Sequence, residues 1–160
     1  MRILGIDPGL AITGWGVIDQ QSTGMRYLDH GVLTTAAHTA LPERLHALDE
    51  QLQQILVRFT PAVVAVEELF FAANAKTAMV VGHARGVILA RVAQHQCELR
   101  EFTPLQIKLA LTGFGRADKR QVGRMATVIL GVRTLHGPDD AIDALAAAIC
   151  AANTMVVKSK

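Results

Sequence analysis

The sequence predicts an α/β fold in which a mixed central sheet of about five strands is flanked by helices. Short apolar runs that end in charged or turn residues alternate with longer segments of helical spacing. The first three runs follow one another through glycine-containing turns, whereas the later runs are separated by helical segments. This order is typical of a single mixed sheet layered with helices.

The predicted strands cover residues 2–7, 12–20, 25–35, 62–66 and 97–102. The predicted helices cover residues 41–58, about 74–95, about 119–131 and about 138–152, with a helical turn after Pro104. Pro61 stops the first helix, and Asn74 is a candidate N-cap of the second. Trp15, in the second strand, is expected to pack in the core.

Composition indicates one globular unit, because 51% of the 160 residues are hydrophobic and 19% are charged. We expect residues 1–153 to form a single domain, followed by a short tail at 154–160. Cys97 and Cys150 are too few for a disulfide framework or a zinc site. No apolar run approaches the roughly 18 residues that span a bilayer. A cytoplasmic, reducing location is therefore expected.

The positive charge is concentrated in one segment. The net charge is +2, but residues 100–133 carry seven Lys and Arg residues against two acids, Glu101 and Asp118. Such asymmetry indicates a polyanionic partner. A solvated basic face explains the charge alone equally well.

Two predicted strands end in acids, Asp7 after ILGI and Glu67 after AVVAV. Neighbouring strand ends that carry carboxylates place them together at one rim of a sheet. Glu68 points to the opposite side of the strand from Glu67, so only one of the two can serve such a site. Glu67 is the better candidate, because it continues the strand.

The segment GPDDAIDALAAAI supplies further acids. Asp140 and Asp143 are three residues apart and share one helical face, whereas Asp139 suits an N-cap or first turn. Asp143 precedes an apolar run, and an unpaired buried carboxylate costs several kcal/mol. Four converging acids need a counter-ion, and hard oxygen ligands suit Mg²⁺, with Mn²⁺ as a substitute. Two such ions about 3.5–4 Å apart support in-line phosphoryl displacement.

Several motifs, in this order, resemble the RuvC-type Holliday-junction resolvases: GIDPG with ITGWGVI, AVEELFFAANAKTA, GHARG, the basic loop TGFGRADKR, and DDAIDALAAAI. The resemblance runs over nearly the whole chain. It implies a ribonuclease-H-like fold, a homodimer, and Mg²⁺-dependent paired nicking of a four-way DNA junction. It also implies a junction-binding branch-migration complex as partner. The family's acidic tetrad matches Asp7, Glu67, Asp140 and Asp143, although some relatives carry His at the position of Asp140.

The resemblance also implies residues that contact DNA. Phe70 matches an aromatic that stacks on an unpaired base at the junction, and Lys76 compensates for a basic residue absent at Ala73. Lys108 and Lys119 match positions near the scissile phosphate. Arg116 and Arg120 are expected to touch the DNA backbone.

A stripe of small residues recurs every four positions in the second predicted helix, at Ala78, Gly82, Gly86 and Ala90. Two helical glycines cost about 1 kcal/mol each relative to alanine, so close packing must offset them. The protein's own sheet and a dimer contact both fit. The resemblance favours the dimer.

Three alternatives fit the sequence less well than a junction nuclease does. An RNA-processing nuclease of the same fold shares the glycine turn, but the basic loop and the DDAIDALA segment favour DNA. An ATPase of the actin and sugar-kinase type needs two lobes and a second glycine hairpin. A catalytically silent junction-binding module has no use for four carboxylates beside its phosphate contacts.

Overall fold

The computed structural model of the chain describes residues 1–68 and 75–158, with the backbone alone at 75–77 and 155–158. Its five strands are β1 (Arg2–Asp7), β2 (Ile12–Gln21), β3 (Gly24–Thr34), β4 (Val63–Glu67) and β5 (Glu98–Phe102). They form one sheet in the order β3-β2-β1-β4-β5. The first three pair antiparallel, whereas β4 runs parallel to both β1 and β5. The predicted mixed five-stranded sheet is confirmed.

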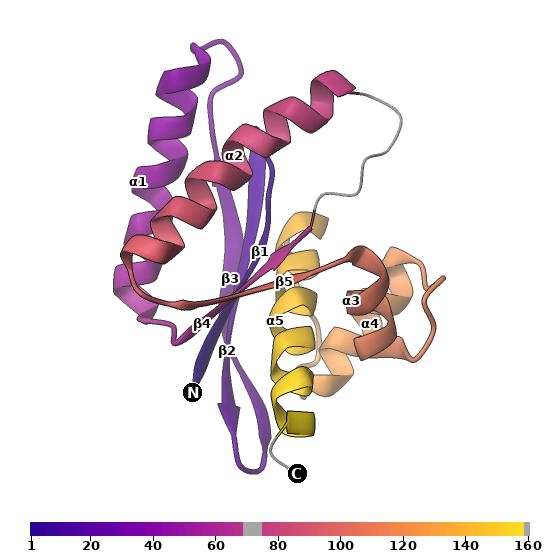
Figure 1. The fold of residues 1–160 in the computed structure, drawn as a ribbon. Coiled ribbons are helices and arrows are strands. Elements are labelled where there is room, and N and C mark those ends of the chain that lie inside the picture. The colour runs from indigo at the N-terminus through magenta and orange to yellow at the C-terminus, as the bar shows by residue number, and fades with distance from the viewer. Residues whose placement is uncertain (69–74, 159–160) are drawn as a thin grey trace.

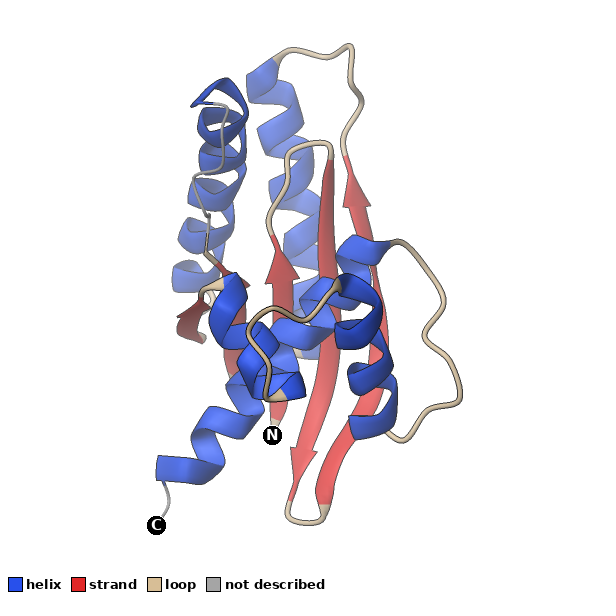
Figure 2. Ribbon diagram, turned by 90° about the vertical axis from the view of Figure 1, so that its right-hand side faces the viewer, coloured by secondary structure: helices blue, strands red, loops and turns tan. Residues whose placement is uncertain are grey.

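Five helices cover the two faces of this sheet (Figure 1). They are α1 (Leu41–Phe59), α2 (Ala75–Gln94), α3 (Pro104–Thr112), α4 (Lys119–Ile129) and α5 (Asp139–Lys158). Helices α1 and α2 lie on one side of the strands, and α3, α4 and α5 lie on the other (Figures 1 and 2). None of the helices in the described part of the chain is long and apolar enough to cross a membrane.

Side chains of the two central strands alternate between two apolar clusters. Leu4 and Ile6 of β1 pack in the cluster under α1 and α2, whereas Ile3 packs in the cluster under α5. The parallel strand β4 alternates in the same way, with Val64 and Val66 in the first cluster and Val63 and Ala65 in the second. Because successive residues point to opposite faces, the next residues, Asp7 and Glu67, both face the α5 side.

Helix α5 lies directly on the sheet because small residues line the contact. A β-carbon on Gly5 would overlap the carbonyl oxygen of Ala144, and one on Gly16 would overlap the side chain of Leu145. Residues 144–152 of α5 are all buried, and most of them are alanine. Helices α3 and α4 then cover the outer side of α5, so this helix is apolar around most of its circumference.

Two helices are longer than predicted. Helix α3 has nine residues instead of a single turn, and its start is closed by a capping box between Thr103 and Gln106. Helix α5 ends at Lys158, six residues beyond the predicted end, since the sequence from 139 to 158 contains no Gly or Pro. The candidate N-cap Asn74 lies outside the described residues.

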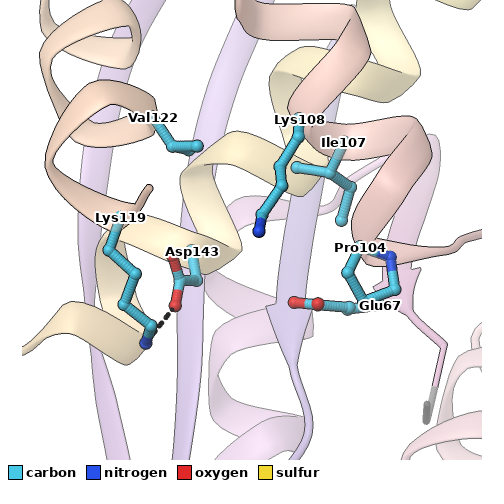
Figure 3. Close-up of a pocket in the computed structure, with 7 residues that line it drawn as sticks. All are labelled: Glu67, Pro104, Ile107, Lys108, Lys119, Val122 and Asp143. Carbon is cyan, nitrogen blue, oxygen red and sulfur yellow. Dashed lines mark hydrogen bonds and ion pairs between the residues drawn. The ribbon is translucent and has the colours of Figure 1, made fainter. Parts of the chain in front are cut away.

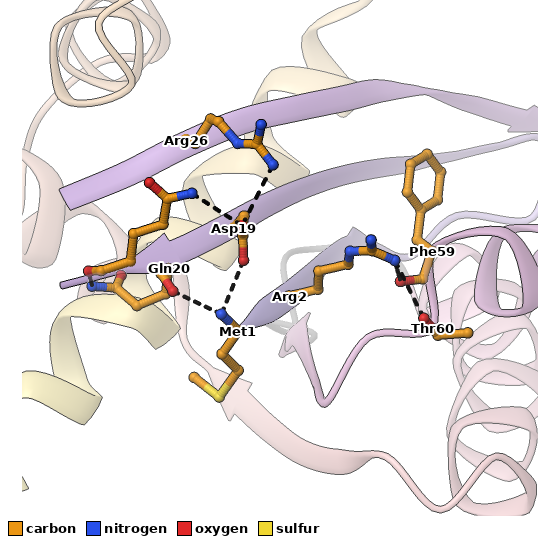
Figure 4. A network of polar contacts seen from close by, with 8 residues as sticks. Met1, Arg2, Asp19, Gln20, Arg26, Phe59 and Thr60 are labelled. Carbon is orange, nitrogen blue, oxygen red and sulfur yellow. Dashed lines mark hydrogen bonds and ion pairs between the residues drawn. The ribbon is translucent and has the colours of Figure 1, made fainter. Parts of the chain in front are cut away.

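Polar contacts fix the end of β1 that lies away from Asp7 (Figure 4). The α-amino group of Met1 donates to the Asp19 carboxylate at 2.9 Å, and Arg2 donates to the Phe59 carbonyl at 2.7 Å. The predicted core position of Trp15 is confirmed, because its ring is buried and lies 5.8 Å from that of Phe59. The strand that carries Asp7 is thus anchored at its beginning to both β2 and α1.

Candidate active site

Asp7 and Glu67 end two adjacent parallel strands. Ile6 is paired with Val66 in the register of β1 and β4, so the next residue on each strand is an acid. Both acids belong to the face covered by α5, as the alternation of core residues requires. The backbone N–H of the next residue, Glu68, donates to the Phe102 carbonyl at 2.8 Å and so continues the pairing of β4 with β5.

The turn after Asp7 is closed by a buried threonine. The Thr13 hydroxyl donates to the Gly9 carbonyl at 2.5 Å and accepts from the Gly9 N–H at 3.3 Å. Thr13 is 1% exposed, which makes it the one buried polar side chain among the described residues. Asp7 therefore lies between a paired strand and a turn that is held by the two hydrogen bonds between Thr13 and Gly9.

Helix α5 brings the other two acids to this rim. Gly14 is the partner of Asp7 in the β1–β2 pairing, and a β-carbon on Gly14 would overlap the Asp140 carbonyl. The first turn of α5 thus lies against the strand pair next to Asp7. Asp140 and Asp143 occur on this part of the helix, and the charges of both act on Asp7.

Burial and the neighbouring carboxylates raise the pKa values of two acids of this group, Asp7 and Glu67. Burial, and then the charges of Glu67, Asp143 and Asp140, raise the pKa of Asp7 to about 8 from its ordinary value of 3.8, with Lys119 opposing the shift. Burial, and then the charge of Asp143, raise the pKa of Glu67 to about 7 from 4.5. The site therefore disfavours full ionisation of its acids unless more positive charge is present.

Two lysines of the outer helices line a pocket together with two of these acids, Glu67 and Asp143. Lys119 begins α4 and donates to Asp143 at 2.8 Å, while Lys108 projects from α3 toward Glu67 (Figure 3). The hydrogen bond with Asp143 is the main cause that raises the pKa of Lys119. The pocket has a volume of about 210 Å³, and its other walls are Pro104, Ile107 and Val122. Acids from the sheet and α5 thus face cations from α3 and α4.

The donor set fits hard divalent cations. All four acids offer carboxylate oxygens, which are the ligands that Mg²⁺ and Mn²⁺ prefer. Burial and then repulsion between neighbouring carboxylates raise the pKa values of Asp7 and Glu67, so a bound cation would favour their ionised forms. In the described part of the chain, no three His, Cys, Asp or Glu side chains already stand as a preformed metal-binding group. Cation binding would therefore draw these carboxylates closer together.

The remaining predicted residues lie in different places. Arg120 lines a smaller adjoining pocket with Lys119 and Asp139, whereas Arg116 is exposed in the loop before α4. Asp139 occupies the first turn of α5, as expected, and its charge contributes to the raised pKa of Lys119. Phe70 lies outside the described residues, and so does the side chain of Lys76.

The sequence did not reveal the residues that shape the site but are neither proposed metal ligands nor proposed DNA contacts. Thr13 and Gly14 fix the geometry around Asp7, yet in the sequence they read as ordinary strand residues. Ile107 and Val122 wall the pocket on its apolar side. One local pattern could have located Ile107. Thr103, Pro104 and Gln106 have the spacing of a capped helix start, which places Ile107 in the first turns of a helix.

Comparisons with known proteins agree with this geometry. A family profile described as crossover junction endodeoxyribonuclease RuvC matches residues 3–151. The chain belongs to the RuvC family. It is 49% identical over 154 residues to the crossover junction endodeoxyribonuclease RuvC of Alkaliphilus oremlandii. The matched region covers 96% of this chain and 94% of that protein. The RuvC of Rubrobacter xylanophilus is 49% identical over 148 residues, covering 92% of this chain and 83% of that protein.

Solved structures give the same result. Thermus thermophilus RuvC superimposes with a TM-score of 0.91 at 33% identity, covering 99% of this chain and 97% of that chain. The same protein in complex with a Holliday junction substrate gives 0.89 at 31% identity, covering 98% and 96%. The yeast mitochondrial Holliday junction resolvase Ydc2 shares the fold, with a TM-score of 0.69 at 15% identity. That superposition covers 98% of this chain and 78% of the yeast chain. The predicted RuvC resemblance and ribonuclease-H-like α/β class are confirmed.

Proposed function

We propose that this chain is a divalent-metal-dependent endonuclease that resolves Holliday junctions by paired, symmetric nicks in recombination and repair. The observation that carries the proposal is the group of four carboxylates around Asp7, two of which, Glu67 and Asp143, share a pocket with Lys108 and Lys119. Membership of the RuvC family supports the junction as substrate. The Thermus thermophilus relative has a structure with such a junction bound.

Asp7, Glu67, Asp140 and Asp143 are the proposed metal ligands. Together they would hold two Mg²⁺ ions, with Mn²⁺ as a substitute, and Asp7 would be the central ligand since the charges of the other three acids all act on it. Such ions, when bound, activate a water molecule and stabilise the leaving oxygen of an in-line displacement. The protein itself would hold the four carboxylates at one rim of the sheet. The turn that Thr13 closes follows the strand end that carries Asp7.

The lysines are the proposed contacts of the scissile phosphate. Lys108 has an ammonium group that projects into the pocket, and Lys119 approaches it from the opposite side (Figure 3). Cationic donors aimed at a phosphate stabilise the charge that develops during displacement. Arg116 and Arg120 would bind the DNA backbone outside the pocket. Phe70 and Lys76 keep their proposed contacts with the junction on family resemblance alone.

A homodimer is part of the proposal, and the small-residue stripe of α2 supports it. Ala84, Ile88 and Val92 turn toward the protein's own core. A β-carbon on Gly82 or Gly86 would have no described atom within 4 Å. The stripe therefore does not serve packing on the protein's own sheet, and a second copy is the partner that would cover it.

Further elements of the proposal rest on the family. A junction-binding branch-migration complex is the partner expected to act on the same DNA. The cytoplasm is the proposed location of this activity. Residues 1–153 are proposed to form a single nuclease domain, followed by a short tail at 154–160.

The deciding experiment compares a synthetic four-way junction with a linear duplex of the same sequence, each in Mg²⁺, Mn²⁺ or EDTA. Asp7→Asn keeps the shape of the side chain and removes its charge. Glu43→Gln, which neutralises an exposed acid of α1, is the matched control. We expect paired nicks in the junction alone, lost in EDTA and in Asp7→Asn, while junction binding persists.

Other outcomes would overturn the proposal. Binding of the junction without cleavage in every metal would identify a junction-recognition module. Cleavage of RNA with the junction left intact would identify an RNA-processing enzyme of the same fold.

A further inference from the structure

The connector between α4 and α5, residues 130–138, leads directly into the helix that carries Asp140 and Asp143. Its first residues are tied to the end of α4 by backbone hydrogen bonds. The N–H of Gly131 donates to the Val128 carbonyl, and the N–H of Val132 donates to the Thr127 carbonyl. Among the described residues, a single hydrogen bond ties the following backbone, residues 133–137, to another part of the chain. That bond joins the His136 carbonyl to the His30 Nε2 of β3 at 2.8 Å.

The chemistry of this contact fixes the hydrogen positions on the His30 ring. A carbonyl oxygen only accepts, so Nε2 carries the hydrogen, and in the neutral ring Nδ1 is the acceptor. The Tyr27 hydroxyl lies 2.7 Å from Nδ1 and donates to it. Burial, with a smaller effect of Asp29, raises the pKa of Tyr27, so this hydroxyl keeps its proton. Tyr27, His30 and the His136 carbonyl form one directed chain.

The position of His30 on the sheet connects this chain to α5. His30 pairs with Gly16 in the β2–β3 register, and Gly16 is the residue on which Leu145 of α5 packs. Gly137 follows the held carbonyl with φ at 137°, a backbone conformation that favours glycine. A β-carbon on Gly137 would lie 3.6 Å from His30 Nε2. The connector therefore turns against His30 immediately before the helix begins at Asp139.

We propose that His30 is a positioning residue of the metal site, which sets the start of α5 and its carboxylates by holding the His136 carbonyl. The proposal deepens the function proposed above and rests on it, because Asp140 and Asp143 are taken as metal ligands. His30 touches neither a proposed ligand nor the pocket. The hydrogen bond from His30 would act on the metal site through the last three residues of the connector, 136–138, which lead into the first turn of α5.

The test measures metal binding to the DNA-free protein, by titration with Mn²⁺ followed by its electron paramagnetic resonance signal. His30→Ala removes the donor, whereas His30→Gln keeps an N–H at nearly the position of Nε2. His38→Ala, at an exposed histidine of the loop before α1, is the control. We expect His30→Ala to weaken Mn²⁺ binding about tenfold, the low end of the range for residues that orient metal ligands. His30→Gln should stay within about twofold of the wild type.

A second readout separates positioning from general stability. The Mg²⁺ concentration for half-maximal junction cleavage should rise in His30→Ala in proportion to the loss of Mn²⁺ affinity, while the rate at saturating Mg²⁺ stays within about twofold. Unchanged Mn²⁺ affinity in His30→Ala would overturn the inference, as would equal weakening in His30→Gln. If His30→Ala does not fold, Tyr27→Phe takes its place, since it removes the hydroxyl that orients the ring.

Failure of the two proposals is distinguishable. If the wild type binds Mn²⁺ but cleaves no junction, the proposed function fails. The difference in Mn²⁺ affinity between His30→Ala and His30→Gln would still test the positioning role of His30.

Discussion

The carbonyl oxygen of Asp140 occupies the space that a side chain on Gly14 would need. Gly14 pairs with Asp7 across β1 and β2, so a single contact fixes the distance between the strand that carries one proposed ligand and the helix that carries two others. The contact joins the backbone of Gly14 to the backbone of Asp140, so rotation of a side chain could not relieve a clash there.

Gly14→Ala should therefore lower both stability and cleavage. Overpacking of this kind costs about 1–3 kcal/mol, and a displaced α5 moves Asp140 and Asp143 away from Asp7. Chemical denaturation and Mn²⁺ titration provide the measurements. Gly123→Ala in α4 is the control, because its β-carbon would lie 3.4 Å from one Ile142 methyl group and should be tolerated. Wild-type Mn²⁺ affinity in Gly14→Ala would contradict the role assigned to this contact.

The metal-free protein should become less stable as the pH rises. The pKa is raised to about 8 for Asp7 and to about 7 for Glu67. Between about pH 4 and pH 8 the folded state thus binds more protons than the unfolded state, and the free energy of unfolding falls. The stabilising contribution is complete below the unfolded pKa values and is lost once the pH passes the folded ones. Thermal unfolding in EDTA from about pH 5 to about pH 9 measures it.

Asp7→Asn identifies the source of that pH dependence. At about pH 9 in EDTA, the variant should melt at least about 3 °C above the wild type. The estimate follows because one pKa unit corresponds to about 1.4 kcal/mol, and 1 kcal/mol to about 2–4 °C for a chain of this size. Mg²⁺ should stabilise the wild type far more than the variant. Parallel pH curves for the two proteins would show that the dependence arises elsewhere.

Lys119 and Arg116 should separate chemistry from DNA affinity. Lys119→Met removes a charge that lowers the pKa of both Asp7 and Glu67, and it removes a donor from the pocket. The single-turnover cleavage rate should fall about 10²–10³-fold, with its pH dependence moved to higher pH. Arg116→Met should leave that rate unchanged and reduce the slope of log affinity against log salt by about 1. Loss of rate in both variants would contradict this division.

The stripe on α2 should control self-association. Gly86→Met adds a long side chain at a position where no described atom lies within 4 Å of the added β-carbon, so the folded monomer should be retained. If a second copy covers this surface, sedimentation equilibrium should show the dimer dissociating at least about tenfold more readily. Gln54→Met, on the exposed surface of α1, provides a comparison of equal hydrophobicity. Equal dimerisation of both variants would place the interface elsewhere.

The sequence predicts most of the fold because its signals are local. Apolar runs that end in acids or turns mark the strands, and leucine spacing marks α1. Helix α3 escaped prediction at its full length because apolar residues lie all round it. Leu105 and Leu109 are exposed, while Ile107 and Leu111 are buried, so no amphipathic period remains.

The site was predictable only in part, for a related reason. Strand ends and helical spacing are enough to predict that Asp7, Glu67, Asp140 and Asp143 gather at one rim. The contact of Lys119 with Asp143 depends on how α4 packs over α5, and residues 24 positions apart give no local sign of it. The bond from His30 to the His136 carbonyl joins residues 106 positions apart, and neither is part of a recognisable motif.

The acids and the lysines of the pocket belong to different layers of the molecule. The carboxylates are fixed to the sheet and to α5, which is locked on it by glycine, whereas Lys108 and Lys119 are carried by α3 and α4, outside α5. The backbone positions that carry the acids are therefore set by the packing of α5 on the sheet. The spacing between acids and lysines depends instead on how α3 and α4 pack on α5. Contacts of a DNA backbone with these two helices would therefore act on the lysines without acting directly on the strands that carry Asp7 and Glu67.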